Sequence, residues 1–120
     1  MTDKVVEEQR ELLTAALEST LQKLSRAYAS MEKKGAMLTL VAKRLDAVRI
    51  GMASLRNTWY GETFEYTYGS IASAKTMLQQ IIPSIETQLV KAKKSSAQHT
   101  LIERRLEALG FAIASLEQRM

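Results

Sequence analysis

Cysteine is absent from this sequence of 120 residues, and the chain has only one proline and five glycines. Without cysteine it has no disulfide framework, thiolate zinc site or cysteine nucleophile. Turns usually need glycine or proline, so their scarcity predicts long helices joined by few turns. No apolar run approaches the roughly 18 residues of a membrane span, and the acidic start MTDKVVEEQRE is unlike a signal peptide. We therefore expect a cytoplasmic protein, or one secreted without a cleaved signal peptide.

The usual catalytic and ligand-binding motifs are missing as well. The sequence has no glycine-rich phosphate loop, metalloprotease helix motif or nucleophile elbow. It also lacks the inward-facing pairs of carboxylates that hold metals in helical bundles. His99, the single histidine, lies in a polar stretch without other metal ligands, so we expect a surface or helix-capping residue. We predict that the protein is not an enzyme and that it binds no metal, cofactor or small-molecule substrate.

Apolar residues recur every three or four positions through the first half of the chain, as in one stripe of a helix. A spacing of seven links one seam within that stripe: Leu17, Leu24, Met31, Leu38, Leu45, Met52 and Trp59. Such a repeat keeps the seam facing a partner helix. The pattern predicts one continuous helical arm over residues 3–57. A turn at Gly35 is the alternative, because two lysines followed by glycine, as in EKKGAM, are typical of a helix end.

A second apolar stripe runs through the other half of the chain and predicts a second arm over residues 62–120. Pro83 predicts a kink near residue 83, because proline removes a backbone hydrogen bond and clashes with the preceding turn. The polar stretch KKSSAQHT predicts a short loop at residues 95–100. Thr100 with Glu103 has the form of a capping box that would open a last helix.

The stretch RNTWYGETFEYTYG separates the two arms. Asn57 and Gly61 tolerate the backbone geometry that ends a helix, so we place the turn at residues 58–61. The predicted fold is one all-α domain over residues 1–120, built as a long antiparallel helical hairpin. A hairpin leaves much of its stripe uncovered. Either a C-terminal helix folds back to complete a bundle, or two hairpins dimerise.

Five of the seven aromatic residues lie within ten positions around this turn. Trp59 is expected to cap the hydrophobic seam by packing over Leu55 and Phe64. Tryptophan and tyrosine are also the most frequent anchors of protein interfaces, and both roles can hold together. The candidate residues for partner binding or an export signal are Trp59, Tyr60, Gly61, Phe64, Tyr66 and Tyr68.

A helix, a Trp59-Tyr60-Gly61 turn and a second helix that begins with a phenylalanine and small residues resemble the Trp-x-Gly family of type VII secretion. The flanking stripes extend the resemblance over most of the chain. It implies a helical hairpin that pairs into a four-helix dimer, and is exported folded or targets a larger effector. It also implies that Trp59 and Gly61 belong to a composite export signal. The C-terminal SLEQRM lacks the family's Tyr-x-x-x-Asp/Glu signal, which a partner would then supply.

The net charge of +4 is unevenly spread, because residues 1–20 hold five acidic residues against two basic ones. Basic pairs are scattered along the remaining chain, whereas a nucleic-acid binder gathers them into one stripe with interleaved aromatics. We therefore predict a protein partner, bound as a homo- or heterodimer through helical faces. The predicted role is a small secreted or effector-targeting partner of a type VII-like system. A cytoplasmic helical adaptor or export chaperone is the alternative, and a basic nucleic-acid-associated bundle comes third.

Overall fold

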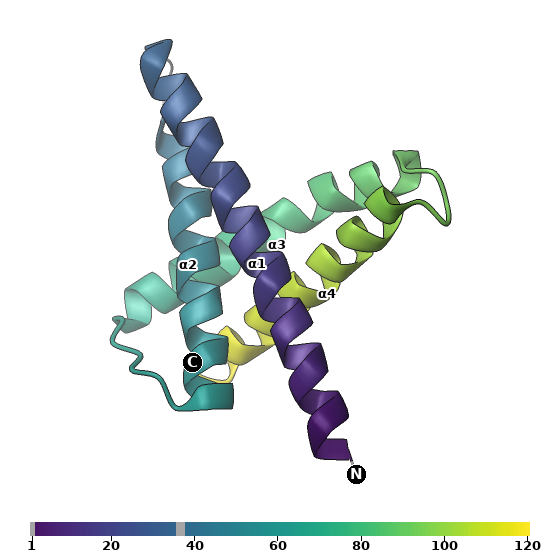
Figure 1. Cartoon of the computed structure of the whole chain (residues 1–120). Coiled ribbons are helices and arrows are strands. Elements are labelled where there is room, and N and C mark those ends of the chain that lie inside the picture. Colours follow the sequence, from purple (N-terminus) through teal and green to yellow (C-terminus); the bar gives the residue numbers. More distant parts are fainter. Residues whose placement is uncertain (1, 36–37) are drawn as a thin grey trace.

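Two helical hairpins that cross each other form the computed structural model, which describes the backbone of residues 2–35 and 38–120 and the side chains from residue 7 onward within these ranges. The helices are α1 (Thr2–Lys33), α2 (Thr39–Tyr60), α3 (Tyr68–Lys91) and α4 (Ala97–Glu117). α1 pairs with α2 and α3 with α4, antiparallel in each case (Figure 1). The chain is thus an all-α four-helix bundle. Its own C-terminal helix completes the bundle, which is the first of the two arrangements predicted from the sequence. No helix in the described part is long and apolar enough to cross a membrane.

The hydrophobic core lies where the hairpins cross. α2 and α4 each contact all the other helices, whereas α1 and α3 do not contact each other within the described ranges. All four helices contribute fully buried aliphatic side chains: Leu13 and Leu17, Val48, Leu78, and Ile102, Leu109 and Leu116. The resulting shape is flat, with extents of 51 × 40 × 21 Å.

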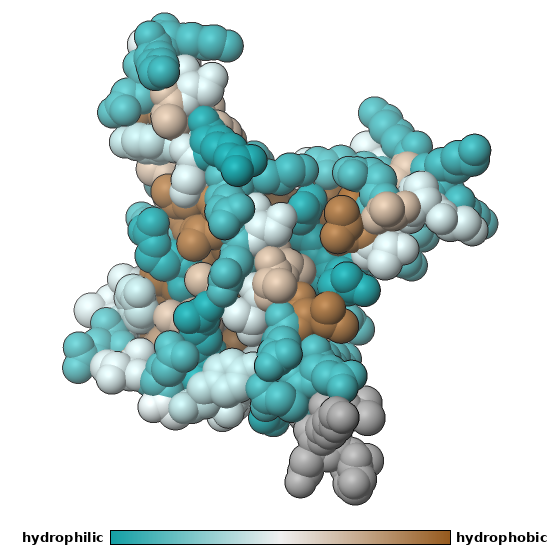
Figure 2. Space-filling view, in the orientation of Figure 1, coloured by the Kyte–Doolittle hydropathy of each residue, from teal (hydrophilic) through white to brown (hydrophobic). Residues whose placement is uncertain are grey.

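The α1–α2 hairpin extends well beyond this crossing. Between Leu21 and Asp46, no described residue is fully buried. The seam of this tip, which includes Leu24 and Met31, is therefore only half covered by the two helices that form it. Figure 2 shows hydrophobic residues at the surface along this arm.

The continuous arm predicted over residues 3–57 is wrong, and the alternative of a turn at Gly35 is correct. Gly35 has a left-handed φ of 70°, and its N–H donates to the carbonyl oxygen of Glu32 at 3.1 Å. Glycine adopts this geometry without steric cost. Residues 36 and 37 lie outside the described residues, and α2 begins at Thr39. Periodicity reports which face is apolar, so a stripe that keeps its phase across a turn also fits two separate helices.

The turn predicted at residues 58–61 is longer in the structure and begins later. α2 continues through Tyr60 and ends at Gly61, which has the expected left-handed φ of 72°. The connection to α3 covers residues 61–67. α3 begins at Tyr68, so the second arm does not start at residue 62. The Thr67 hydroxyl caps this start by accepting a hydrogen bond from the backbone N–H of Ser70 at 3.1 Å.

Pro83 lies inside α3, which continues from Tyr68 to Lys91. The proline therefore does not end the helix, and a kink at this position stays a prediction. One turn later, the hydroxyl of Thr87 donates to the carbonyl oxygen of Pro83 at 3.0 Å.

The loop predicted at residues 95–100 occurs slightly earlier, at residues 92–96. Ser95 has a left-handed φ of 70° there. Ser96 is the residue that caps α4, because its hydroxyl oxygen accepts a hydrogen bond from the backbone N–H of His99 at 3.0 Å. The capping role predicted for Thr100 is therefore wrong, since Thr100 already lies within the first turn of α4.

Candidate functional site

The six predicted site residues lie at the end of α2 and along its connection to α3. This connection follows the end of the bundle where the C-terminus also lies (Figure 1). Ring contacts form two groups, Trp59 with Tyr60 and Phe64 with Tyr66, while Tyr68 has no ring contact among the described residues. The rings of Trp59 and Phe64 both border the core, but no described ring contact joins them. The predicted packing of Trp59 over Phe64 is therefore not found, although Trp59 does pack against the core.

Three helices converge on the half-buried indole of Trp59. The ring of Phe111, from α4, meets it edge-on with centroids 6.2 Å apart, and Tyr60 does so at 6.4 Å. The guanidinium carbon of Arg10, from α1, lies 5.6 Å from the indole centroid, within the range of a cation–π contact. Trp59 thus ties the end of α2 to both α1 and α4.

Tyr60 combines an exposed ring with an acidic neighbourhood. Partial burial and then the carboxylate of Glu7 raise the pKa of Tyr60 above the ordinary tyrosine value, with Glu11 adding to the effect. The phenol is protonated at neutral pH, as is usual for tyrosine, and can donate a hydrogen bond. Tyr60 is the charge-neutral, amphipathic kind of side chain that protein interfaces favour.

Arg119 fastens the chain's C-terminal segment to the end of α2. Its guanidinium donates to the hydroxyl of Ser54 at 2.6 Å, the carbonyl oxygen of Ser54 at 3.0 Å and the side-chain oxygen of Asn57 at 2.8 Å. The positive charge thereby meets the negative end of the α2 dipole. The same guanidinium lies 4.0 Å from the ring centroid of Phe64, which in turn contacts Tyr66.

The end of α2 is also held by hydrogen bonds of its own. The side-chain amide of Asn57 donates to the carbonyl oxygen of Glu62 at 2.7 Å and so braces the first residues of the connection. One turn earlier, the hydroxyls of Ser54 and Ser115 lie 2.6 Å apart in the core and join α2 to α4. The rings of Phe64 and Tyr66 therefore lie beside a segment that several hydrogen bonds hold in place.

Sequence reasoning missed several of these residues. Phe111 lies far from the aromatic stretch, and Arg10 looks like an ordinary helix-surface charge. Arg119 carries no local sign of its partners, which lie more than sixty positions away. Only the small side chain of Ser54 gave a signal, because it belongs to a face of α2 on which small residues recur.

We define the aromatic end of the bundle as the half-buried Trp59 and Phe64 together with four exposed rings. The exposed fractions of these rings are 39% for Tyr60, 39% for Tyr66, 64% for Tyr68 and 41% for Phe111. Large rings with few rotatable bonds lose little entropy when they are covered by a partner. The chemistry that this surface offers is therefore adhesion with hydrogen bonding through phenols.

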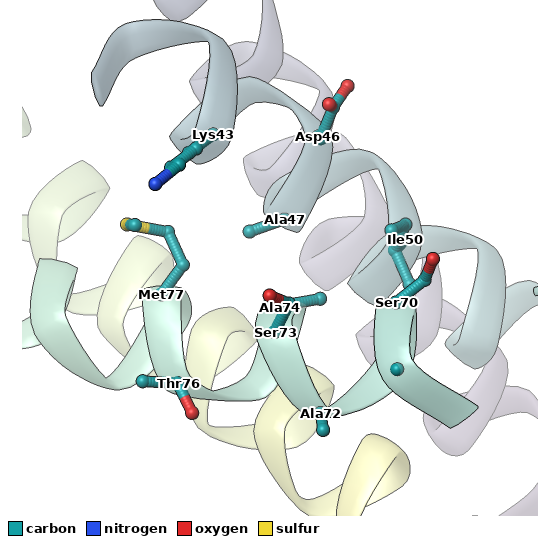
Figure 3. Close-up of a pocket in the computed structure, with 11 residues that line it drawn as sticks. Lys43, Asp46, Ala47, Ile50, Ser70, Ala72, Ser73, Ala74, Thr76 and Met77 are labelled. Atoms are coloured by element: carbon teal, nitrogen blue, oxygen red, sulfur yellow. The ribbon is translucent and has the colours of Figure 1, made fainter. Parts of the chain in front are cut away.

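A separate groove of about 520 Å³ runs between α2 and α3 (Figure 3). Small side chains, including Ala47, Ser73 and Ala74, line its floor. Lys43 and Met77 lie at one end of it in the close-up. Asp46, the single acid of the lining, is paired with Arg49 at 3.2 Å. The groove thus provides a concave surface and the amine of Lys43. No contact between a nucleophile and a base is found among its described lining residues.

The predicted basic pairs fall at separate places in the fold. Lys33 and Lys34 lie at the tip of the first hairpin, whereas Lys93 and Lys94 lie at the tip of the second, and these tips point apart in Figure 1. The side chain of Arg105 is buried. These charges form no single stripe, so nucleic acid stays the least favoured partner.

Comparisons with protein-family models, with curated proteins and with solved structures found no match to this chain. The resemblance to the Trp-x-Gly family therefore rests on the residues quoted above. In the structure, the Trp59-Tyr60-Gly61 tripeptide ends the second of four helices, whereas the resemblance implied that it joins the two arms of a simple hairpin.

Proposed function

We propose that this protein binds another protein through the aromatic end of the bundle. The observation that carries the proposal is the exposure of four large rings around the end of α2 and the start of α3, where Phe111 of α4 also meets Trp59. Aromatic anchors of this kind provide most of the binding energy at many protein interfaces. The function is thus a protein-interaction module.

The mounting of the rings supports the same proposal. Gly61 ends α2 with a fixed turn, and Arg119 holds Phe64 through its cation–π contact. A surface that is already ordered costs less entropy to bind than a flexible one.

A narrower form of the proposal is a role as a secreted or effector-targeting partner of a type VII-like system. The accessible Trp59-Tyr60-Gly61 turn at a helix end supports it. The completion of a bundle by one chain supports the alternative, an adaptor or export chaperone that needs no second copy to bury its core. The half-covered seam at the α1–α2 tip leaves room for a homo- or heterodimer through helical faces.

Export from a host that has a type VII system separates these two roles. Trp59→Phe keeps an aromatic ring beside Phe111 and removes the indole, so the fold should survive while an indole-dependent export signal is lost. We expect secretion of the parent and retention of the variant if the protein is exported. Equal secretion of both chains, or retention of the parent, would remove the secretion role.

The general proposal is tested with a double variant, Tyr66→Ser with Tyr68→Ser. Proximity labelling in the native host should identify a partner whose affinity falls by about 30-fold or more in this variant, as expected for loss of interface anchors. Val90→Ser is the matched control, because Val90 is 85% exposed near the end of α3. It should leave the affinity unchanged. Equal binding by the parent and the tyrosine variant, with unchanged thermal melting, would contradict the proposal.

A further inference from the structure

Arg105 is a mostly buried arginine that has no counterion within the described part of the chain. Its side chain lies on α4 and is only 8% exposed, yet it forms no salt bridge within the described residues. Its Nε atom is inaccessible to solvent and has no hydrogen-bond partner. Burial also lowers the pKa of the Arg105 guanidinium. Buried charges in proteins are normally paired, because desolvation without compensation is costly.

Arg105 lines a small cavity between α1 and α4. The cavity has a volume of about 110 Å³ and is lined by Leu12, Ala15, Ala16, Ser19, Leu101, Arg104 and Arg105. This volume corresponds to roughly four water molecules at about 30 Å³ each. It is well below the roughly 300 Å³ of the smallest typical ligand sites. One side chain of a partner is the largest group that it suits.

The rim of the cavity is apolar and open. Leu12 on α1 is 46% exposed, and Leu101 on α4 is 51% exposed. In Figure 2, hydrophobic residues reach the surface where α1 passes in front of α4. Exposed leucines beside two arginines fit a partner that presents an acid between apolar residues.

No acid of the described residues lines this cavity. The lining holds two arginines and no carboxylate. Glu18, on α1, pairs with Arg56 of α2 instead, and Glu103, on α4, lies 3.3 Å from His99. The arginines therefore remain available for a carboxylate from outside the chain.

We propose that the cavity between α1 and α4, which is distinct from the aromatic end, binds a helix of an acidic partner protein. A carboxylate of the partner enters the cavity and pairs with Arg104 and Arg105, while its apolar side chains cover Leu12 and Leu101. Charge complementarity favours a different protein over a second copy, because each copy carries a net charge of +4. An arginine fork matches a carboxylate in two parallel hydrogen bonds, which gives the contact its specificity.

The first test measures the stability of the free protein. Arg105→Met keeps a long side chain and removes the unpaired charge, so we expect the melting temperature to stay the same or rise. A residue kept for binding at the expense of stability has this signature. Arg105→Lys keeps the charge and loses the fork, and should gain no stability. A clear fall in melting temperature with Arg105→Met would assign the arginine a purely structural role and overturn the proposal.

The second test measures binding with a display library of 16-residue amphipathic helical peptides, selected on the intact parent protein. Enriched peptides should carry Glu or Asp flanked by leucine-like residues, and Arg105→Met should weaken them by about 30-fold or more. Arg44→Met is the matched control: it removes the same charge from a half-buried α2 arginine whose Nε also lacks a partner. Tyr68→Ser is a second control that separates binding at this cavity from binding at the aromatic end. Both controls should bind as the parent does.

Several outcomes would overturn the proposal. These are the absence of enriched peptides, enrichment of non-acidic peptides, and equal binding to the parent and Arg105→Met. Inorganic phosphate could instead raise the melting temperature of the parent but not of Arg105→Met. If the peptide did not compete with that phosphate, the cavity would be an anion site and the proposal would be wrong. Light scattering that shows a dimer of the parent, but not of Arg105→Met, would mean that a second copy of the chain binds at this cavity.

Discussion

Two glycines in helix interiors, Gly51 of α2 and Gly110 of α4, provide a matched pair of substitutions with opposite expected effects. Each loses conformational freedom on folding, and replacement by alanine favours the helix by about 1 kcal/mol at each site. The surroundings differ. A Cβ atom at Gly110 meets nothing within 4 Å. A Cβ atom at Gly51 lies 3.1 Å from both the Ala112 Cβ and the Leu78 Cδ1 atoms.

The sign of the effect at Gly51 depends on whether these neighbours can move. Leu78 and Ala112 are both fully buried, so neither can swing into open space. The Ala112 Cβ atom is fixed to the backbone of α4 and moves only with the helix. Overpacking of a dense core costs about 1–3 kcal/mol. This cost offsets or exceeds the gain in helix propensity, so we expect Gly51→Ala to lose up to about 2 kcal/mol of unfolding free energy. Gly110→Ala should gain about 0.5–1 kcal/mol.

Urea denaturation followed by circular dichroism measures both changes. Thermal melting should move up by roughly 3–5 °C for Gly110→Ala and down for Gly51→Ala. The double variant Gly51→Ala with Ala112→Gly relieves one of the two contacts, so it should be more stable than the sum of the single changes. Equal stabilisation by the two alanines, or strictly additive energies in the double variant, would show that α2 and α4 do not approach this closely.

Two further expectations concern the aromatic end. Arg119→Met removes the charged hydrogen bonds to Ser54 and Asn57 and should cost about 1–2 kcal/mol of unfolding free energy; unchanged urea denaturation would refute the fastening role of Arg119. The raised pKa of Tyr60 favours the neutral phenol in the folded state, so its stabilising effect is present below the unfolded pKa of about 10 and is lost as the pH rises through the folded value. Tyr60→Phe should therefore flatten the alkaline loss of stability and remove one raised-pKa component from the tyrosine absorbance titration, and an unaltered titration would contradict this.

Periodicity identified the helical faces correctly and the helix ends poorly. The seam residues Leu17 and Met52 do face the core, because burial of apolar side chains selects the face. Helix ends depend on local competition between backbone hydrogen bonds and caps, which sequence constrains less. Ser96 and Thr100 are both acceptable caps, and four positions separate them. The structure selects Ser96.

Five of the six rings of the aromatic end could be read from the sequence. The clustering of Trp59 with Tyr60 and the left-handed Gly61 are local features, and sequence shows them directly. The partners that give these residues their roles are distant in the chain, and only folding brings Phe111 and Arg119 beside them. The basic pair Arg104 and Arg105 carries no local sign of its environment, whereas the structure buries Arg105.

The sequence alone determined an all-α protein, because apolar spacings of three, four and seven residues bury one stripe only in a helix. It also determined where large rings are concentrated. Tertiary structure decided that the chain turns at Gly35, that two hairpins cross, and that Arg105 lies uncompensated between α1 and α4. The physical reason is that the apolar spacing specifies which helix faces must be buried. The packing of small residues such as Gly51 against α4 decides which of these faces contact each other.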